Sequence, residues 1–348
     1  MKSRLLSVAP LVFLLLTLQV YADDGEQIPS GEAEDIAKLS QFIATGVATK
    51  ATHNGHAFRD AHRKHHGCVR ASFAVMDKIP TRLAQGLFAT PQSYRAWIRF
   101  SNGSGDSQKD GVGDGRGMAV KILGVPGAKM LGDGNETATQ DFVMINHPVF
   151  FIRNVNDYVG FQEATDAGLF STLWWFARHI SHEGRIAWAI KQKKITNPLD
   201  TRYWSMTPSK LGDEQIKFSA KPCRTSQLTE HTVGDGFLAE NMQHDLAESN
   251  ACFEFLVQLR NQPADMPIED PTIEWDERVA PFIPIAQIEI PRQKPETSEF
   301  CETLAFSPWH TLPEHRPLGG ISRARREIYR AVSRMRHVMN NQPELEPK

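Results

Sequence analysis

The stretch YRAWIRFSNGSGDSQKDGVGDGRGMAVKILG, residues 94–124, decides the fold class, because it alternates apolar and polar side chains at both ends. Such alternation is typical of β-strands, here over 94–101 and 118–124, and the glycine-rich centre at 102–117 predicts a long turn. A phosphate-binding loop is the alternative interpretation of these glycines. The alternative is disfavoured because the order G-x-x-x-x-G-K-[ST] is absent and no G-x-G-x-x-G opens a helix. The segment therefore predicts two antiparallel strands.

Similar short alternations predict further strands, at 69–76, 141–146, 214–222, 253–259 and 283–291. Between 157 and 194 the apolar spacing becomes helical, and it predicts helices at 169–180 and 185–194. A last helix is expected from near Gly320 to Met339. Strands followed by helices, then more strands and a terminal helix, indicate an α+β fold rather than an alternating α/β sheet. We expect an antiparallel β-barrel core with surrounding helices.

The first 22 residues have the pattern of a secretory signal peptide, with Lys2 and Arg4 ahead of an apolar run and small residues before Asp23. We therefore expect a periplasmic protein in which 23–348 form a single domain, with an ordered core at about 32–340 and frayed ends at 23–35 and 340–348. No later apolar run reaches the roughly 20 residues of a membrane span. The formal charge of −2, with dispersed basic residues, indicates neither nucleic acid nor lipid as a partner.

The role of the four cysteines does not follow from the sequence. The four cysteines, Cys68, Cys223, Cys252 and Cys301, contain no C-x-x-C pair, so a zinc ribbon or a thioredoxin motif is disfavoured. Export would permit disulfides, but their pairing does not follow from spacing.

The segment FRDAHRKHHGC, residues 58–68, contains three histidines with spacing i, i+3 and i+4. On a helix, His62, His65 and His66 would share one face and could bind zinc. The H-E-x-x-H type of spacing is absent, so an exposed basic stretch is the favoured interpretation of His65 and His66.

The expected terminal helix places an arginine and a tyrosine one turn apart, on or next to its apolar face. Ile321, Arg325, Ile328 and Val332 recur at helical spacing, and Tyr329 lies beside them. Arg325 could reach solvent with its long side chain, leaving Tyr329 an ordinary rim residue. Alternatively, Arg325 could hold Tyr329 as a phenolate, which at neutral pH would need both a neighbouring cation and a bound metal.

Five motifs in order resemble the catalase superfamily, specifically its short secreted catalase-related peroxidases. They are Arg59-x-x-His62 followed by Gly67, IRFSNG at 98–103, DGRGMAVK at 114–121, NHPVFFIRN at 146–154, and AFSPW at 305–309 leading to Arg325-x-x-x-Tyr329. The resemblance spans most of 23–348 and implies a haem b in a pocket inside the barrel. It implies Tyr329 as the ligand of the iron, because a tyrosinate holds the haem of catalases.

The resemblance also implies roles for further residues. Arg59 and Arg99 would pair with the haem propionates, since guanidinium groups bind carboxylates in a bidentate manner. The cofactor site would also include Ser101, Tyr158 and Arg325, with Tyr158 as an aromatic neighbour of the haem.

Two further residues would carry catalysis. His62 would move a proton between the two peroxide oxygens, and Asn146 would orient the peroxide.

The implied function is a peroxidase that reduces organic hydroperoxides, hydrogen peroxide or both, with an electron donor that the sequence does not identify. A fatty-acid hydroperoxide isomerase of the allene oxide synthase type and a non-catalytic haem-binding protein are the alternatives. The small residues that follow the essential histidine in large catalases are replaced by 63–66, Arg-Lys-His-His, and we expect weaker hydrogen peroxide dismutation in consequence. The oligomeric state stays open, a homodimer being one alternative.

Overall fold

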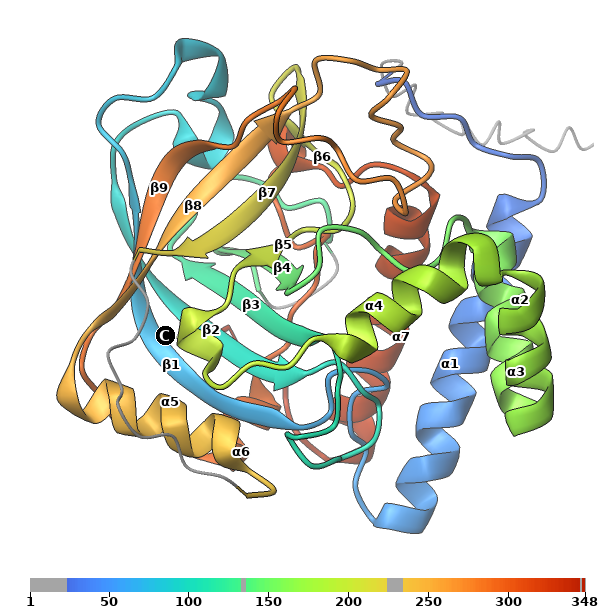
Figure 1. Cartoon of the computed structure of the whole chain (residues 1–348). Helices are drawn as coiled ribbons and strands as arrows, with labels where there is room; N and C mark the ends of the chain where they lie inside the picture. The colour runs from blue at the N-terminus through green and yellow to red at the C-terminus, as the bar shows by residue number, and fades with distance from the viewer. Residues whose placement is uncertain (1–23, 133–135, 224–233, 345, 348) are drawn as a thin grey trace, which may run out of the picture.

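Nine strands form the core of the computed structural model, which describes residues 24–132, 136–223, 234–344 and 346–347. They are β1 (His65–Val75), β2 (Ser93–Asn102), β3 (Arg116–Leu123), β4 (Thr139–Ile145), β5 (Tyr203–Trp204), β6 (Ser209–Leu211), β7 (Glu214–Pro222), β8 (Ala251–Leu259) and β9 (Ile283–Ile290). Their order is β5-β4-β3-β2-β1-β9-β8-β7-β6, and β5 also pairs with β7. That pairing closes eight antiparallel strands into a barrel (Figure 1). The predicted signal peptide lies outside the described residues.

Helices surround the barrel, as predicted for an α+β fold (Figure 1). They are α1 (Glu32–Asn54), α2 (Val155–Asp166), α3 (Leu169–Arg178), α4 (Arg185–Gln192), α5 (Phe237–Glu248), α6 (Ser298–Thr303) and α7 (Gly320–Met339). The predicted strands and the terminal helix are confirmed, with bounds that differ by a few residues. In the part of the chain that the structure describes, no helix is both long and apolar enough to cross a membrane.

Aromatic side chains fill the barrel interior. Even-numbered residues of β2, β3 and β4 point inward, and so does Phe73 of β1. The rings of Phe73 and Phe142 lie 5.2 Å and 4.7 Å from the ring of Phe255 on β8. Burying each such ring contributes about 2–3 kcal/mol to folding. An eight-stranded barrel is filled by its own side chains, which leaves the outer face for a site.

Helix α1 covers α7, and both begin at points held by ion pairs. Leu39, Ile43 and Val47 of α1 form a buried cluster with apolar residues of α7. Glu32, at the start of α1, lies 2.6 Å from Arg323 of α7. This packing fixes the rotation of α7 about its own axis.

The expectation of a frayed segment at 23–35 is wrong for its described residues. Asp24 lies 2.6 Å from Arg316, and Glu26 lies 2.7 Å from the same guanidinium. Asp24 also lies 2.8 Å from Lys210 of β6. The sequence shows only an acidic stretch there, because its basic partners are about 190 to 290 residues away in the chain.

Two disulfides join Cys68 to Cys301 and Cys223 to Cys252. The first ties β1 to α6, across a sequence separation of 233 residues. The spacing left this pairing open, since only the folded barrel brings the partners together.

Candidate functional site

A cavity of about 320 Å³ lies between the outer face of β2, β3 and β4 and the inner face of α7. The outward residues of these strands line it, including Ser101, Gly117, Val143 and Ile145, and Phe151 adds an aromatic wall. The prediction that the pocket lies inside the barrel is therefore wrong, because phenylalanines occupy the interior. Residues of α1, α2, α4 and α7 line the cavity on the side away from the sheet.

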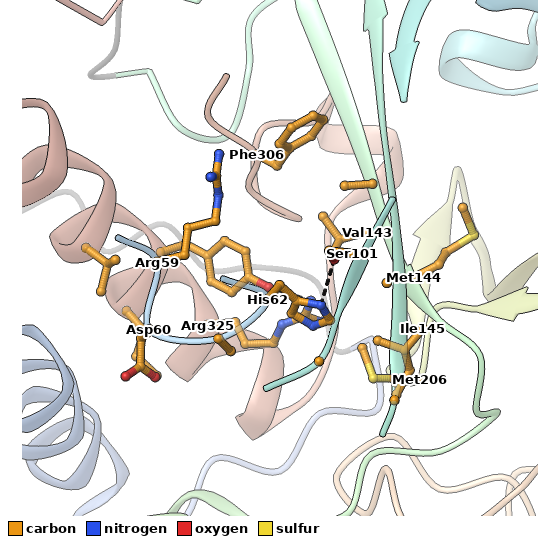
Figure 2. A pocket seen from close by; sticks show the side chains of 18 of the residues that line it. Arg59, Asp60, His62, Ser101, Val143, Met144, Ile145, Met206, Phe306 and Arg325 are labelled. Atoms are coloured by element: carbon orange, nitrogen blue, oxygen red, sulfur yellow. Dashed lines mark hydrogen bonds between the residues drawn. The ribbon is translucent and has the colours of Figure 1, made fainter. Parts of the chain in front are cut away.

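His62 reaches the cavity from the segment just before β1. Its backbone is left-handed, with φ of 59°, and its N–H donates to the carbonyl oxygen of Gly103 at 3.0 Å. Imidazole Nδ1 lies 3.1 Å from Ser101 Oγ (Figure 2). A Cβ on Gly117 would lie 2.6 Å from Nδ1, so glycine at 117 is what lets the ring rest on β3.

The charge state of His62 follows from its surroundings. Burial, together with the positive charges of Arg99, Arg325 and Arg59, lowers the pKa of His62 to about 4. The imidazole is therefore neutral at pH 7 and can accept a proton.

Arg325 (Figure 2) and Tyr329 line the same cavity from α7. Arg325 Nη2 donates to Tyr329 Oη at 3.3 Å, and the arginine is almost completely buried. The interpretation in which the Arg325 side chain reaches solvent is therefore wrong. Its guanidinium is directed at the tyrosine oxygen instead, as the α7 spacing allowed.

Three arginines gather around one carboxylate at the cavity edge. Glu302 of α6 lies 2.6 Å from Arg59, 3.5 Å from Arg99 and 3.2 Å from Arg336. All three arginines line the cavity. Although burial alone would raise the pKa of Glu302, the three guanidiniums together lower it. Arg99 Nη2 also donates to the carbonyl oxygen of His62 at 2.9 Å, which holds the histidine backbone.

The arginine cluster carries more positive charge than Glu302 compensates. Three guanidiniums face one carboxylate, and the Nε atoms of Arg99 and Arg336 are buried without a hydrogen-bond acceptor. Burial, with the charge of Arg59, lowers the pKa of Arg336 to about 9. Such a cluster is suited to bind an anion.

Arg336 and Glu302 were missed from the sequence. Arg336 follows Tyr329 by seven residues, which places both on one face of α7, so helical spacing could have found it. Glu302 carried no comparable signal, because it lies 34 residues before Arg336 on a separate helix.

Of two other predicted residues, Tyr158 lines the cavity and Asn146 does not. Tyr158 of α2 packs against Phe150 and Phe151, with ring centroids 5.9 Å and 6.5 Å away. The Asn146 Oδ1 atom accepts a hydrogen bond from the Arg116 backbone N–H at 2.7 Å, at the start of β3. Its role in orienting peroxide stays a prediction.

The two histidines after Lys64 do not form a zinc site with His62. They begin β1, at an irregularity of its pairing with β2, rather than extend a helix, and each imidazole has a different partner. His65 Nε2 lies 2.8 Å from Ser298 Oγ, and His66 Nε2 lies 2.9 Å from Asn102 Oδ1. The expectation that both are exposed and charged is also wrong. His66 is buried, and burial lowers the pKa of each to about 4.

A different group of potential metal ligands lies elsewhere in the described residues. It consists of Glu136, Asp141 and His310. The buried ammonium of Lys121 lies 2.5 Å from Glu136 and 2.8 Å from Asp141. A cation therefore already balances these carboxylates.

Comparisons with known proteins identify the architecture. No protein-family profile matches the chain, and no curated protein sequence matches it. Among solved structures, a fungal catalase superposes with a TM-score of 0.66 at 16% identity, over 86% of this chain and 65% of that one. Catalase A from Saccharomyces cerevisiae superposes with a TM-score of 0.61 at 19% identity, over 83% of this chain and 63% of that one. The chain thus spans a little under two thirds of each catalase, and it has the catalase-like fold.

Proposed function

We propose that this protein is a haem-dependent peroxidase that reduces organic hydroperoxides, hydrogen peroxide or both. One observation carries the proposal. A neutral histidine, an arginine-supported tyrosine and an excess of buried positive charge meet in a single cavity on the outer face of the barrel. The likeness to two catalases supports the fold on which the proposal rests.

The residues of the cavity fit haem b in charge and in chemistry. The cluster of Arg59, Arg99 and Arg336 exceeds Glu302 by two positive charges, which matches the two propionates of a haem. Val143 and Ile145 line the cavity and would provide apolar contact for the macrocycle.

The proposed ligand and substrate groups come from different elements. Tyr329 would hold the iron through its phenolate, and Arg325, 3.3 Å from the oxygen, would stabilise the ionised form. When bound, haem supplies the redox-active iron that receives the oxidising equivalents of the peroxide.

His62 is the proposed proton carrier. In the tautomer whose Nδ1–H donates to Ser101 Oγ, the lone pair of Nε2 would accept the hydroperoxide proton. The same proton can then pass to the departing oxygen, so that it leaves as water or an alcohol. The hydrogen bond from Arg99 to the His62 carbonyl fixes the segment that carries this imidazole.

The test uses purified protein reconstituted with haem. We expect a Soret band that changes on adding peroxide, and turnover of cumene hydroperoxide with a reducing dye. His62→Ala should keep the Soret band and lose turnover by about 100-fold or more, the usual contribution of a general acid–base group. His65→Ala, which removes a neighbouring imidazole of the same segment, is the matched control and should keep turnover.

Three results would contradict the proposal in different ways. Full turnover by His62→Ala removes His62 from its role. Haem binding without turnover at any pH indicates a non-catalytic haem protein. Conversion of a fatty-acid hydroperoxide to an epoxide or ketol without consumption of a donor indicates an isomerase.

We also propose that the chain is exported to the periplasm after removal of residues 1–22. Two disulfides support this location, because such bonds persist in oxidising compartments and are rare in the cytosol. Fractionation of the expressing cells, with mass spectrometry of the mature N-terminus, tests the proposal. Recovery of the uncleaved chain in the cytosol would overturn it.

A further inference from the structure

Helices α3 and α4, joined by a π-helical turn at Ile180–Gly184, expose large apolar side chains to solvent. Phe170 is 89% exposed, Trp174 67% and Trp188 66%. With aromatic areas of about 150–250 Å² each, these three rings alone expose on the order of 400 Å². Leu169, Leu173 and Ile180 are exposed as well. Large apolar side chains exposed this closely along one segment mark a binding surface.

The patch lies on the outside of the helical layer. Leu169, Phe170, Leu173 and Trp174 recur along one face of α3, while Trp175 on the other face is buried. Figure 1 shows α3 next to α2 at one edge of the molecule, with α4 running toward the barrel. The apolar face of α3 is therefore turned away from the protein core.

Basic side chains accompany this apolar surface. Arg178, Arg185, Lys191 and Lys194 are exposed between 169 and 194. The one acidic residue in that range, Glu183, is buried. Asp166, at the end of α2, is the exposed carboxylate just before the range. Aromatic and aliphatic residues interleaved with lysine and arginine are typical of helices that lie in the interface of an anionic bilayer.

We propose that the surface of α3 and α4, the α3–α4 face, binds the headgroup region of an anionic lipid bilayer. Phe170, Trp174 and Trp188 would enter the boundary between headgroups and acyl chains, where aromatic side chains are favoured. The basic residues would lie against the lipid phosphates. The overall charge balance of the sequence indicated no lipid partner, because an average over the whole chain conceals this local excess of positive charge.

The α3–α4 face adjoins the cavity. Ile190 of α4 lines the cavity, and a Cβ at Gly113 would overlap the carbonyl oxygen of Lys191. The end of α4 therefore packs against the glycine-rich loop at the cavity rim. Bilayer binding would bring that rim close to hydroperoxides of lipid acyl chains, a consequence that rests on the proposed function.

Sedimentation with vesicles tests the binding and needs neither haem nor turnover. We expect the protein to pellet with phosphatidylglycerol–phosphatidylcholine vesicles, far less with phosphatidylcholine alone, and less at high salt. The fluorescence of Trp174 and Trp188 should shift to shorter wavelength on binding. The double variant Arg185→Glu/Lys191→Glu should bind at least about tenfold more weakly, since each basic residue near an anionic surface contributes about fivefold.

Two further variants separate the patch from other exposed apolar residues. Phe170→Ser/Trp174→Ser should abolish pelleting, with a circular dichroism spectrum like that of the unchanged protein. Val338→Ser, at an exposed position of α7, is the matched control and should pellet normally. Equal pelleting by all variants, or equal binding to neutral vesicles, overturns the proposal. A dimer that Phe170→Ser/Trp174→Ser disperses, without vesicle binding, assigns the patch to a second copy of the chain instead.

Discussion

Replacing Glu302 by glutamine tests the electrostatics of the cavity edge. Glu302 is the carboxylate shared by Arg59, Arg99 and Arg336, at distances of 2.6, 3.5 and 3.2 Å. Its side chain is 11% exposed, so water compensates little for the loss of its charge. The substitution keeps the shape of the side chain, removes the negative charge and replaces one acceptor oxygen by an NH2 group.

The expected cost follows from the burial of the cluster. Removing one partner of a buried ion pair costs about 3–5 kcal/mol, because the other charge is left uncompensated. Glutamine can still accept hydrogen bonds, so we expect the lower end, about 3 kcal/mol, in the haem-free protein. The neutral glutamine would also no longer repel the haem propionates. Haem should therefore bind Glu302→Gln more tightly than the unchanged protein, by about tenfold for each 1.4 kcal/mol of relieved repulsion.

Two measurements check these values. Urea unfolding of the haem-free protein gives the change in the free energy of unfolding. Haem titration at the Soret band gives the change in affinity. Glu299→Gln, at an exposed position of the same helix α6, is the matched control and should change stability by less than about 0.5 kcal/mol. Haem affinity that falls in Glu302→Gln would refute the placement of the propionates at this arginine cluster.

Three other predictions follow from the same site. The pKa of His62 is lowered to about 4, and the imidazole must be unprotonated to act as the base. Peroxidase activity should therefore stay level from neutral pH downward and fall only as the pH decreases through about 4. A pH–rate profile with a midpoint near the ordinary histidine pKa of about 6.5 would contradict this. Gly117→Ala should displace the His62 imidazole and destabilise the protein by about 1–3 kcal/mol, with a loss of turnover larger than that of Gly111→Ala, where nothing lies within 4 Å. Tyr329→Phe should lose haem or shift the Soret band, and an unchanged spectrum would exclude Tyr329 as the iron ligand.

Local pattern was sufficient for most of the secondary structure. The period-two alternation of 94–101 and 118–124 predicted β2 and β3, and helical spacing predicted α7 with Arg325 and Tyr329 one turn apart. These elements are well predicted because each has one buried face, and that face imposes its period on the sequence. Helix α1 was not predicted, because its acidic start was interpreted as a frayed end, although acidic residues in a first turn favour a helix and Leu39, Ile43 and Val47 recur at helical spacing.

The sequence by itself determined the type of fold, through its strand and helix periods. Seven of the eight site residues that its motifs named also line the cavity. Only the tertiary structure decided that the cavity lies outside the barrel, because whether an interior is filled depends on how side chains from all eight strands pack together. The same holds for Glu302, the disulfide pairs and the neutral histidines. Each depends on charges or partners that lie far away in sequence and meet only after the barrel has closed and burial has lowered the local dielectric.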